Sequence, residues 1–237
     1  MMRYYLPLGL ALVPILGMVN QNEVIAQTST NTVEIAAWPT NDWSFWPNDD
    51  DQAPQRTVSG ASRDSCSNHQ MIPLLPESQH GFTSKSHPEI LVATSVNTPR
   101  QVLFIVQSES GYYYETYLDL PETPGIVSIR LPDEAPALAD NELYQWSLIM
   151  MCNDKLRPDS PALHGWIRLQ VGESNSYTEN SLEQAVTYHN DYLWYDMIAM
   201  LADLRRQDPD NQDVYYAWQS TLEGADLESV ANAPILE

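Results

Sequence analysis

Catalytic side chains are present in this 237-residue sequence, but their spacing matches no established catalytic motif. The five histidines include no pair separated by three residues, the spacing that sets two metal ligands on one helix face. No G-x-S-x-G turn presents a serine nucleophile. A catalytic carboxylate pair stays open, because 32 acidic residues make any chosen pair uninformative. We therefore predict no enzymatic activity, no metal site and no cofactor.

The segment from Asp208 to Gln219 begins like an EF-hand calcium loop. Asp213 stands at the sixth position, where the loop needs glycine, and Gln219 at the twelfth, where it needs glutamate. This segment is therefore predicted to connect two helices.

Two sets of aromatic and charged side chains are candidate binding surfaces, because each set alternates along a predicted strand and so shares one face of it. They are Tyr113, Glu115 and Tyr117 on one strand, and His164, Trp166 and Arg168 on another. The first face is either open to a sugar or a partner protein, or it rests on a neighbouring sheet. We expect C-terminal helices to cover the second face, with Trp194 or Met197 over Trp166.

The charge balance limits the kinds of partner. The chain has 32 acidic and 11 basic residues, which give a formal charge of −21. Binding to a phosphate backbone needs a basic surface, so we expect no nucleic-acid partner. A protein or glycan partner in the cell envelope is expected instead.

Residues 1–26 predict an export signal. Arg3 supplies a positive charge, Leu6–Val19 is an apolar run broken by two prolines, and small residues precede a cleavage site near Ala26 and Gln27. A membrane anchor is the alternative, but a span needs about 20 consecutive apolar residues. We therefore expect a periplasmic or secreted protein with no stable membrane insertion after cleavage.

The two cysteines, Cys66 and Cys152, predict a disulfide bond, because an oxidising compartment lets exported thiols pair. A crosslink over so long a loop stabilises a fold by about 4 to 5 kcal/mol. Two unpaired core thiols are the alternative.

Three segments follow the export signal. Residues 27–62 are acidic and contain prolines and tryptophans without periodicity, which predicts a flexible linker. Residues 63–172 contain short extended runs between Pro, Gly, Asn and Ser, which is typical of an antiparallel β-sandwich of immunoglobulin-like size. The expected strands are 89–94, 101–107, 112–120, 125–131, 143–152 and 163–171.

Residues 173–237 change to a helical period and predict a helical hairpin or three-helix unit docked on the sandwich. The first helix begins at Ser181, and the second ends at Arg206 before Pro209. Asp210 or Asn211 then caps a third helix.

Several stretches resemble a known family. They are Arg63-Asp64-Ser65-Cys66, Gly125-Ile126-Val127-Ser128-Ile129, Tyr144-Gln145-Trp146-Ser147, Gly165-Trp166-Ile167, and Leu193-Trp194-Tyr195-Asp196 followed by Leu204-Arg205-Arg206 and Pro209. In order and spacing they resemble the family called domain of unknown function 928, whose members are exported and mostly cyanobacterial. The resemblance covers about Cys66 to the C-terminus. Because that family has no assigned activity, the resemblance implies an architecture and a compartment, and no catalytic residue.

A weaker similarity links the helical segment to a single tetratricopeptide repeat, through Ala185, Tyr188, Asn190, Tyr195, Ala202 and Pro209. A solenoid needs about three stacked repeats, so one repeat predicts a helical pair that leans on the sandwich. An independent peptide-binding groove is the alternative.

Together these features predict an exported, non-enzymatic binding or envelope-associated interaction module. A carbohydrate-binding module is one alternative, and it requires two or three exposed aromatic rings on one sheet face. A periplasmic or extracellular hydrolase is the other, and it requires a deep cleft with converging carboxylates or histidines.

Overall fold

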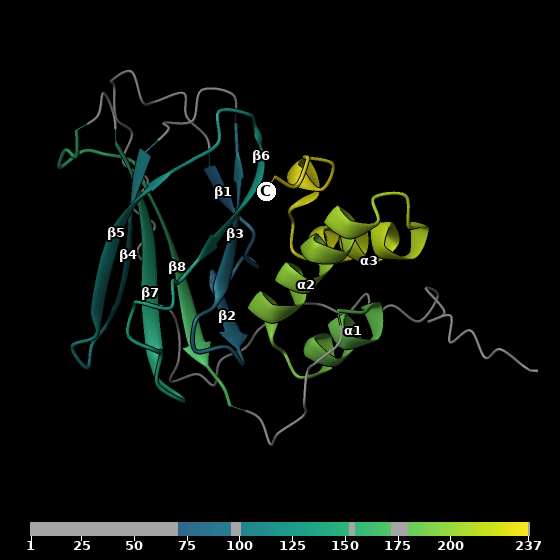
Figure 1. Ribbon diagram of the computed structural model, residues 1–237, viewed down its shortest axis with the longest axis horizontal. Coiled ribbons are helices and arrows are strands. Elements are labelled where there is room, and N and C mark those ends of the chain that lie inside the picture. Colours follow the sequence, from purple (N-terminus) through teal and green to yellow (C-terminus); the bar gives the residue numbers. More distant parts are fainter. Residues whose placement is uncertain (1–70, 96–100, 152–154, 172–179, 237) are drawn as a thin grey trace, which may run out of the picture. The chain divides into compact units, whose positions relative to one another are not determined.

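Figure 1 shows the computed structural model, which describes residues 71–95, 101–151, 155–171 and 180–236. The predicted export signal, the linker and the Cys66–Cys152 disulfide lie outside these residues. All described elements belong to one unit of the chain.

The described strands form two facing sheets, as a β-sandwich requires. The three-stranded sheet has the order β1 (Met71–Pro73), β3 (Glu89–Thr94) and β6 (Gly125–Arg130). The five-stranded sheet has the order β2 (His80–Thr83), β8 (Ala162–Leu169), β7 (Leu143–Met150), β4 (Gln101–Ser108) and β5 (Tyr113–Asp119). Paired strands are antiparallel except β2 and β8, which are parallel. The mainly β fold with C-terminal helices is confirmed, with this one parallel pair added.

Alternating side chains form the core between the sheets. On β7, Tyr144, Trp146, Leu148 and Met150 are all buried, as their period of two predicts. The Trp146 ring lies directly over Gly165 of β8, where a Cβ atom would come within 2.4 Å of the ring. Glycine is therefore needed at this position for the ring to approach the strand.

Within residues 180–236, the structure has three α-helices, α1 (Leu182–Asn190), α2 (Trp194–Gln207) and α3 (Gln212–Glu223), and a 3-10 turn, η3 (Glu228–Val230). Ser181 caps α1 by accepting a hydrogen bond from the Gln184 amide. Asn211 caps α3 by accepting from the amides of Asp213 and Val214. Both caps satisfy amides that have no partner inside the helix.

The helices lie on the side of the three-stranded sheet that faces away from the five-stranded sheet (Figure 1). All six residues of β3 are buried, because one face of this strand packs on the other sheet and the opposite face packs under α2. Sandwich and helices share a single core. The helical unit is therefore a third layer of the same fold.

The C-terminal segment closes the free edge of β6. The Ile126 amide donates to the Pro234 carbonyl at 2.7 Å, and the Leu236 amide donates to the Ile126 carbonyl at 2.8 Å. Ile126 and Ile235 thus form a parallel bridge. Pairing of this kind protects a strand edge that would otherwise be open to other chains.

Helix α2 packs on the side of the five-stranded sheet opposite to the one expected. The Tyr195 ring lies against Gly81 of β2, which pairs with the inward-facing Ile167 of β8. Trp194 is fully buried and donates to the Leu74 carbonyl at 2.9 Å. The Tyr195 contact is with the inner side of the five-stranded sheet, and the Trp194 bond is to the residue that follows β1 of the three-stranded sheet. Neither contact is on the Trp166 side.

Candidate functional site

The strand register brings the two predicted surfaces onto one face of the five-stranded sheet. Across the sheet, Trp166 pairs with Gln145, Gln145 with Gln107, and Gln107 with Tyr113. Paired residues of neighbouring strands point to the same side of a sheet. The resulting outer face is formed by Tyr113, Glu115 and Tyr117 of β5, Leu103, Ile105 and Gln107 of β4, Gln145, Ser147 and Ile149 of β7, and His164, Trp166 and Arg168 of β8.

The aromatic side chains of the outer face are accessible. Tyr113 and Tyr117 are 55% and 56% exposed. His164, Trp166 and Arg168 are partly exposed. The two tyrosines therefore do not rest on a neighbouring sheet, which was the alternative for this strand.

Hydrogen bonds within the outer face fix the orientation of its polar groups. The Tyr113 hydroxyl donates to Glu115, two residues further along the same side of β5. The ring must therefore lean along the strand. This bond, which keeps the hydroxyl proton in place, raises the pKa of Tyr113. The Gln107 side-chain amide donates to Oε1 of Gln145 at 3.2 Å, which leaves other donors and acceptors of both side-chain amides available to a ligand.

Ser147 and His164 form the one pair on the outer face that suggests nucleophilic chemistry. The Ser147 hydroxyl lies 2.8 Å from His164 Nδ1, and burial lowers the pKa of His164. A catalytic serine also needs a carboxylate that orients the base, and none of the described residues is recorded as such a partner. Glu115 is in the same row as His164 but three strands away, at about 14 Å. The geometry is therefore that of a cross-strand hydrogen bond.

The dimensions of the outer face suit an extended ligand. Tyr113 and Tyr117 are four residues apart on one strand, a distance of about 14 Å. Trp166 lies three strands away from Tyr113, which is also about 14 Å. The polar Gln107 and Gln145 lie between the rings. The face can therefore stack a ligand at its margins and hydrogen-bond it in the middle.

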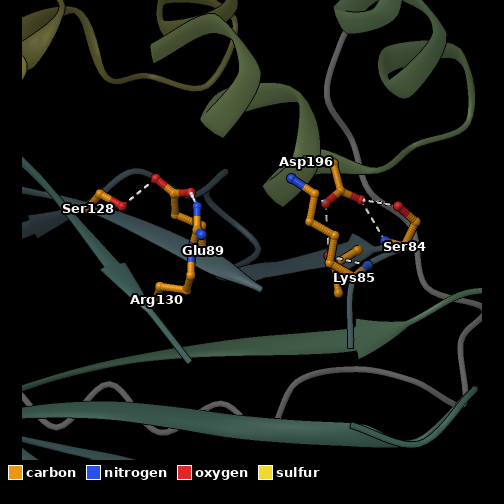
Figure 2. A network of polar contacts seen from close by, with 7 residues as sticks. Ser84, Lys85, Glu89, Ser128, Arg130 and Asp196 are labelled. Atoms are coloured by element: carbon orange, nitrogen blue, oxygen red, sulfur yellow. Dashed lines mark hydrogen bonds and ion pairs between the residues drawn. The ribbon is translucent and has the colours of Figure 1, made fainter. Parts of the chain in front are cut away.

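A second polar group, the junction cluster, lies where α2 meets the sheets. Figure 2 shows Ser84, Lys85, Glu89, Ser128, Arg130 and Asp196 of this cluster. The cluster consists of Thr83, Ser84, Lys85, Glu89, Ser128, Arg130, Asp196 and Arg206. No sequence motif pointed to it. Its only signal was Asp196, a carboxylate inside an otherwise apolar helix face.

Asp196 is almost completely buried, at 1% exposure. It accepts hydrogen bonds from the Thr83 hydroxyl at 3.1 Å, the Ser84 amide at 2.5 Å and the Ser84 hydroxyl at 2.9 Å. Lys85 Nζ is 4.0 Å away. Burial raises the pKa of Asp196 even though these neighbours favour its ionised form. Asp196 therefore fastens the first turn of α2 to the end of β2.

Glu89 fastens the other end of the same helix. Burial opposes its ionisation, but hydrogen bonds from Ser128 and Arg130 outweigh burial and hold the pKa of Glu89 below its usual value. Arg130 is 3.0 Å away on β6, and Arg206 of α2 is 3.9 Å away. Since the Asp196 and Glu89 carboxylates both accept hydrogen bonds from residues of the sheets and the loop after β2, the junction cluster is a structural clasp.

One cleft with a volume of about 380 Å³ lies between the end of β5 and β6, and its lining includes Leu118, Asp119, Val127 and Arg130. It contains none of the candidate binding residues. Within the described ranges, no group of three or more histidine, cysteine and acidic side chains is placed to hold a metal ion. No helix in the described part of the chain is long and apolar enough to cross a membrane.

The fold and the outer face define a β-sandwich module with a helical third layer. Its outer sheet face exposes aromatic rings on β5, whereas Leu103 and Ser147 on the same face are buried. The chain belongs to the family described as Domain of Unknown Function (DUF928), whose model matches residues 58–235. The resemblance found in the sequence is thereby confirmed. No curated protein matches the chain.

Proposed function

We propose that the protein is an exported, non-enzymatic binding module that engages a partner in the cell envelope through the outer face. One observation carries this proposal. The register places all six candidate side chains on one sheet face, and Tyr113 and Tyr117 are each more than half exposed there. Exposed aromatic rings on a rigid scaffold are typical of recognition surfaces.

The packed core beneath the outer face favours ligand binding. The outer face belongs to the widest sheet, and its strands rest on a core that includes Trp146 and Phe104, both fully buried. A ligand therefore meets side chains that are already ordered, which reduces the entropy lost on binding. The charge of −21 disfavours anionic partners and leaves neutral or basic ones.

The proposal is tested by binding of the purified mature chain to isolated envelope material. The first variant, Tyr113→Ala with Tyr117→Ala, removes two exposed rings and leaves the core intact. The matched control, Tyr216→Ala, removes a ring that is 50% exposed on α3. We expect saturable binding by the wild type and the control, and an affinity at least about tenfold lower for the double variant.

Two results would overturn the proposal: absence of envelope binding by the wild type, or equal binding by the double variant. Circular dichroism and thermal unfolding establish that each variant is folded. Export is tested separately by sequencing the N-terminus of the protein recovered from cells. We expect it to begin near Gln27, whereas an intact Met1 would contradict export through a cleaved signal.

A further inference from the structure

We infer that the ligand of the outer face is an uncharged, linear oligosaccharide. This inference rests on the proposed function and names the chemical class of its partner. It is based on the placement of the three rings, on the polar groups between them and on the charge of the surface.

The rings provide stacking surfaces at the margins. One face of a pyranose ring presents C–H bonds, and these are attracted to the electron-rich face of an aromatic ring. The hydrogen bond from Tyr113 to Glu115 holds the tyrosine along the strand and limits its rotation. Tyr117 and Trp166 each lie about 14 Å from Tyr113, which is too far for one sugar to contact both rings of a pair. The ligand must therefore be a chain of several sugars.

The row between Tyr113 and Trp166 provides hydrogen bonds. Gln107 and Gln145 are paired at 3.2 Å, so their orientation is set before a ligand arrives. An amide can donate and accept at once, which matches the hydroxyl groups of a sugar. Glu115 is held by the Tyr113 hydroxyl and has further acceptor capacity. This alternation of rings and amides suits a ligand that has both apolar faces and hydroxyl edges.

The surface chemistry disfavours the other occupants. A protein partner needs an interface of about 800 Å² on each side with an apolar centre. On this face, the row that joins Tyr113 to Trp166 is bridged by the polar amide pair of Gln107 and Gln145. Anionic glycans and nucleic acids would meet Glu115 and Asp119 on β5 in a chain with a charge of −21. A neutral sugar chain avoids both costs.

Calorimetric titration of the mature chain tests the inference. The probes are linear oligomers of glucose, mannose, xylose and N-acetylglucosamine, with an oligomer of galacturonate as the anionic comparison. We expect at least one neutral oligomer to bind, with an affinity that increases with chain length, and the anionic oligomer to bind more weakly. Each Tyr→Ala change at positions 113 and 117 should lower the affinity about three- to tenfold.

Conservative variants separate stacking from a structural effect. Tyr117→Phe keeps the ring and should keep the affinity, whereas Tyr113→Phe also loses the bond that orients the ring and should show an intermediate loss. Tyr216→Ala serves as the matched control. Equal affinity in the Tyr→Ala variants would overturn the placement of the ligand on the outer face, and preference for galacturonate would overturn the neutral class.

The envelope assay distinguishes failure of this inference from failure of the proposed function. If no oligomer binds while envelope binding still depends on the rings, the oligosaccharide is refuted and a protein partner takes its place. If neither oligomers nor envelope material bind, both proposals are refuted. Periodate oxidation of the envelope material gives an independent check, because it destroys sugar rings and should abolish binding.

Discussion

Replacing Asp196 tests whether this buried carboxylate fastens α2 to the sandwich. Asp196→Ala removes the acceptor of three hydrogen bonds, at 3.1, 2.5 and 2.9 Å, and leaves their donors without this partner. At about 1 kcal/mol for each bond, we expect a loss of about 3 kcal/mol in the free energy of unfolding. For a protein of this size the melting temperature should fall by about 6 to 12 °C.

Asp196→Asn should behave differently. The asparagine oxygen can accept both bonds from Ser84, and its amide can donate to the Thr83 hydroxyl, which already accepts from the Lys85 amide. The variant also avoids the cost of burying a charge. We therefore expect its stability at neutral pH to lie within about 1 kcal/mol of the wild type.

The stability of the wild type should depend on pH through the ionisation of Asp196. Burial raises the pKa of Asp196, so the folded chain holds this proton more strongly than the unfolded chain does. The contribution of Asp196 to stability is therefore largest in acid and decreases as the pH rises through the raised pKa. Asparagine has no such dependence, so the stability of Asp196→Asn relative to the wild type should improve from acid to neutral pH.

Urea unfolding at a series of pH values measures all three chains, with Asp133→Ala as a control at an exposed aspartate. If Asp196→Asn is as damaging as Asp196→Ala at neutral pH, the carboxylate charge itself is stabilising and the reasoning fails. The same reasoning would be refuted if the stability of Asp196→Asn relative to the wild type decreased from acid to neutral pH.

Three further changes are predicted. Gly165→Ala should destabilise the fold by about 1 to 3 kcal/mol, because its Cβ would lie 2.4 Å from the Trp146 ring; denaturant midpoints that match the wild type would contradict this. Tyr195→Phe should cost about 2 kcal/mol in the same assay, because its hydroxyl accepts from Trp146 and donates to the Trp166 carbonyl. Burial lowers the pKa of His189 from 6.5 to about 4, so the unfolded chain gains this proton first and stability should fall as the pH decreases between these values. His189→Gln should flatten that part of the pH profile, and an unchanged slope would show that other groups cause it.

The sequence was informative where one strand or helix carries its own pattern. The strand at Glu89–Thr94 and the inward Val127 and Ile129 on β6 match the predictions, because burial on one face forces a period of two. The helix start at Ser181 also matches, and of the two caps expected for the third helix, Asp210 or Asn211, the structure has Asn211. Both side chains bond to amides within the same turn. Local physics was sufficient for these features.

Features that depend on distant partners were not predicted. Strands β1 and β2 have three and four residues, too few to show a period, and β2 is held by parallel pairing with β8. The outer face emerged only from the strand order, because β5 and β8 are separated by β4 and β7. The docking side of α2 depends on the space beside β2 that the three-stranded sheet leaves open, and no periodicity in the helix encodes that space.

The pairing of Ile126 with the C-terminal segment affects the order in which the chain can fold. The amide and carbonyl of Ile126 bond to Pro234 and Leu236, which come from the last residues of the described chain. Contacts between such distant segments form slowly, because a long loop must close first. The edge of β6 therefore stays open during synthesis until residues 234–236 have emerged. During that interval the strand is most exposed to pairing with other chains, and arrival of this short segment ends the exposure.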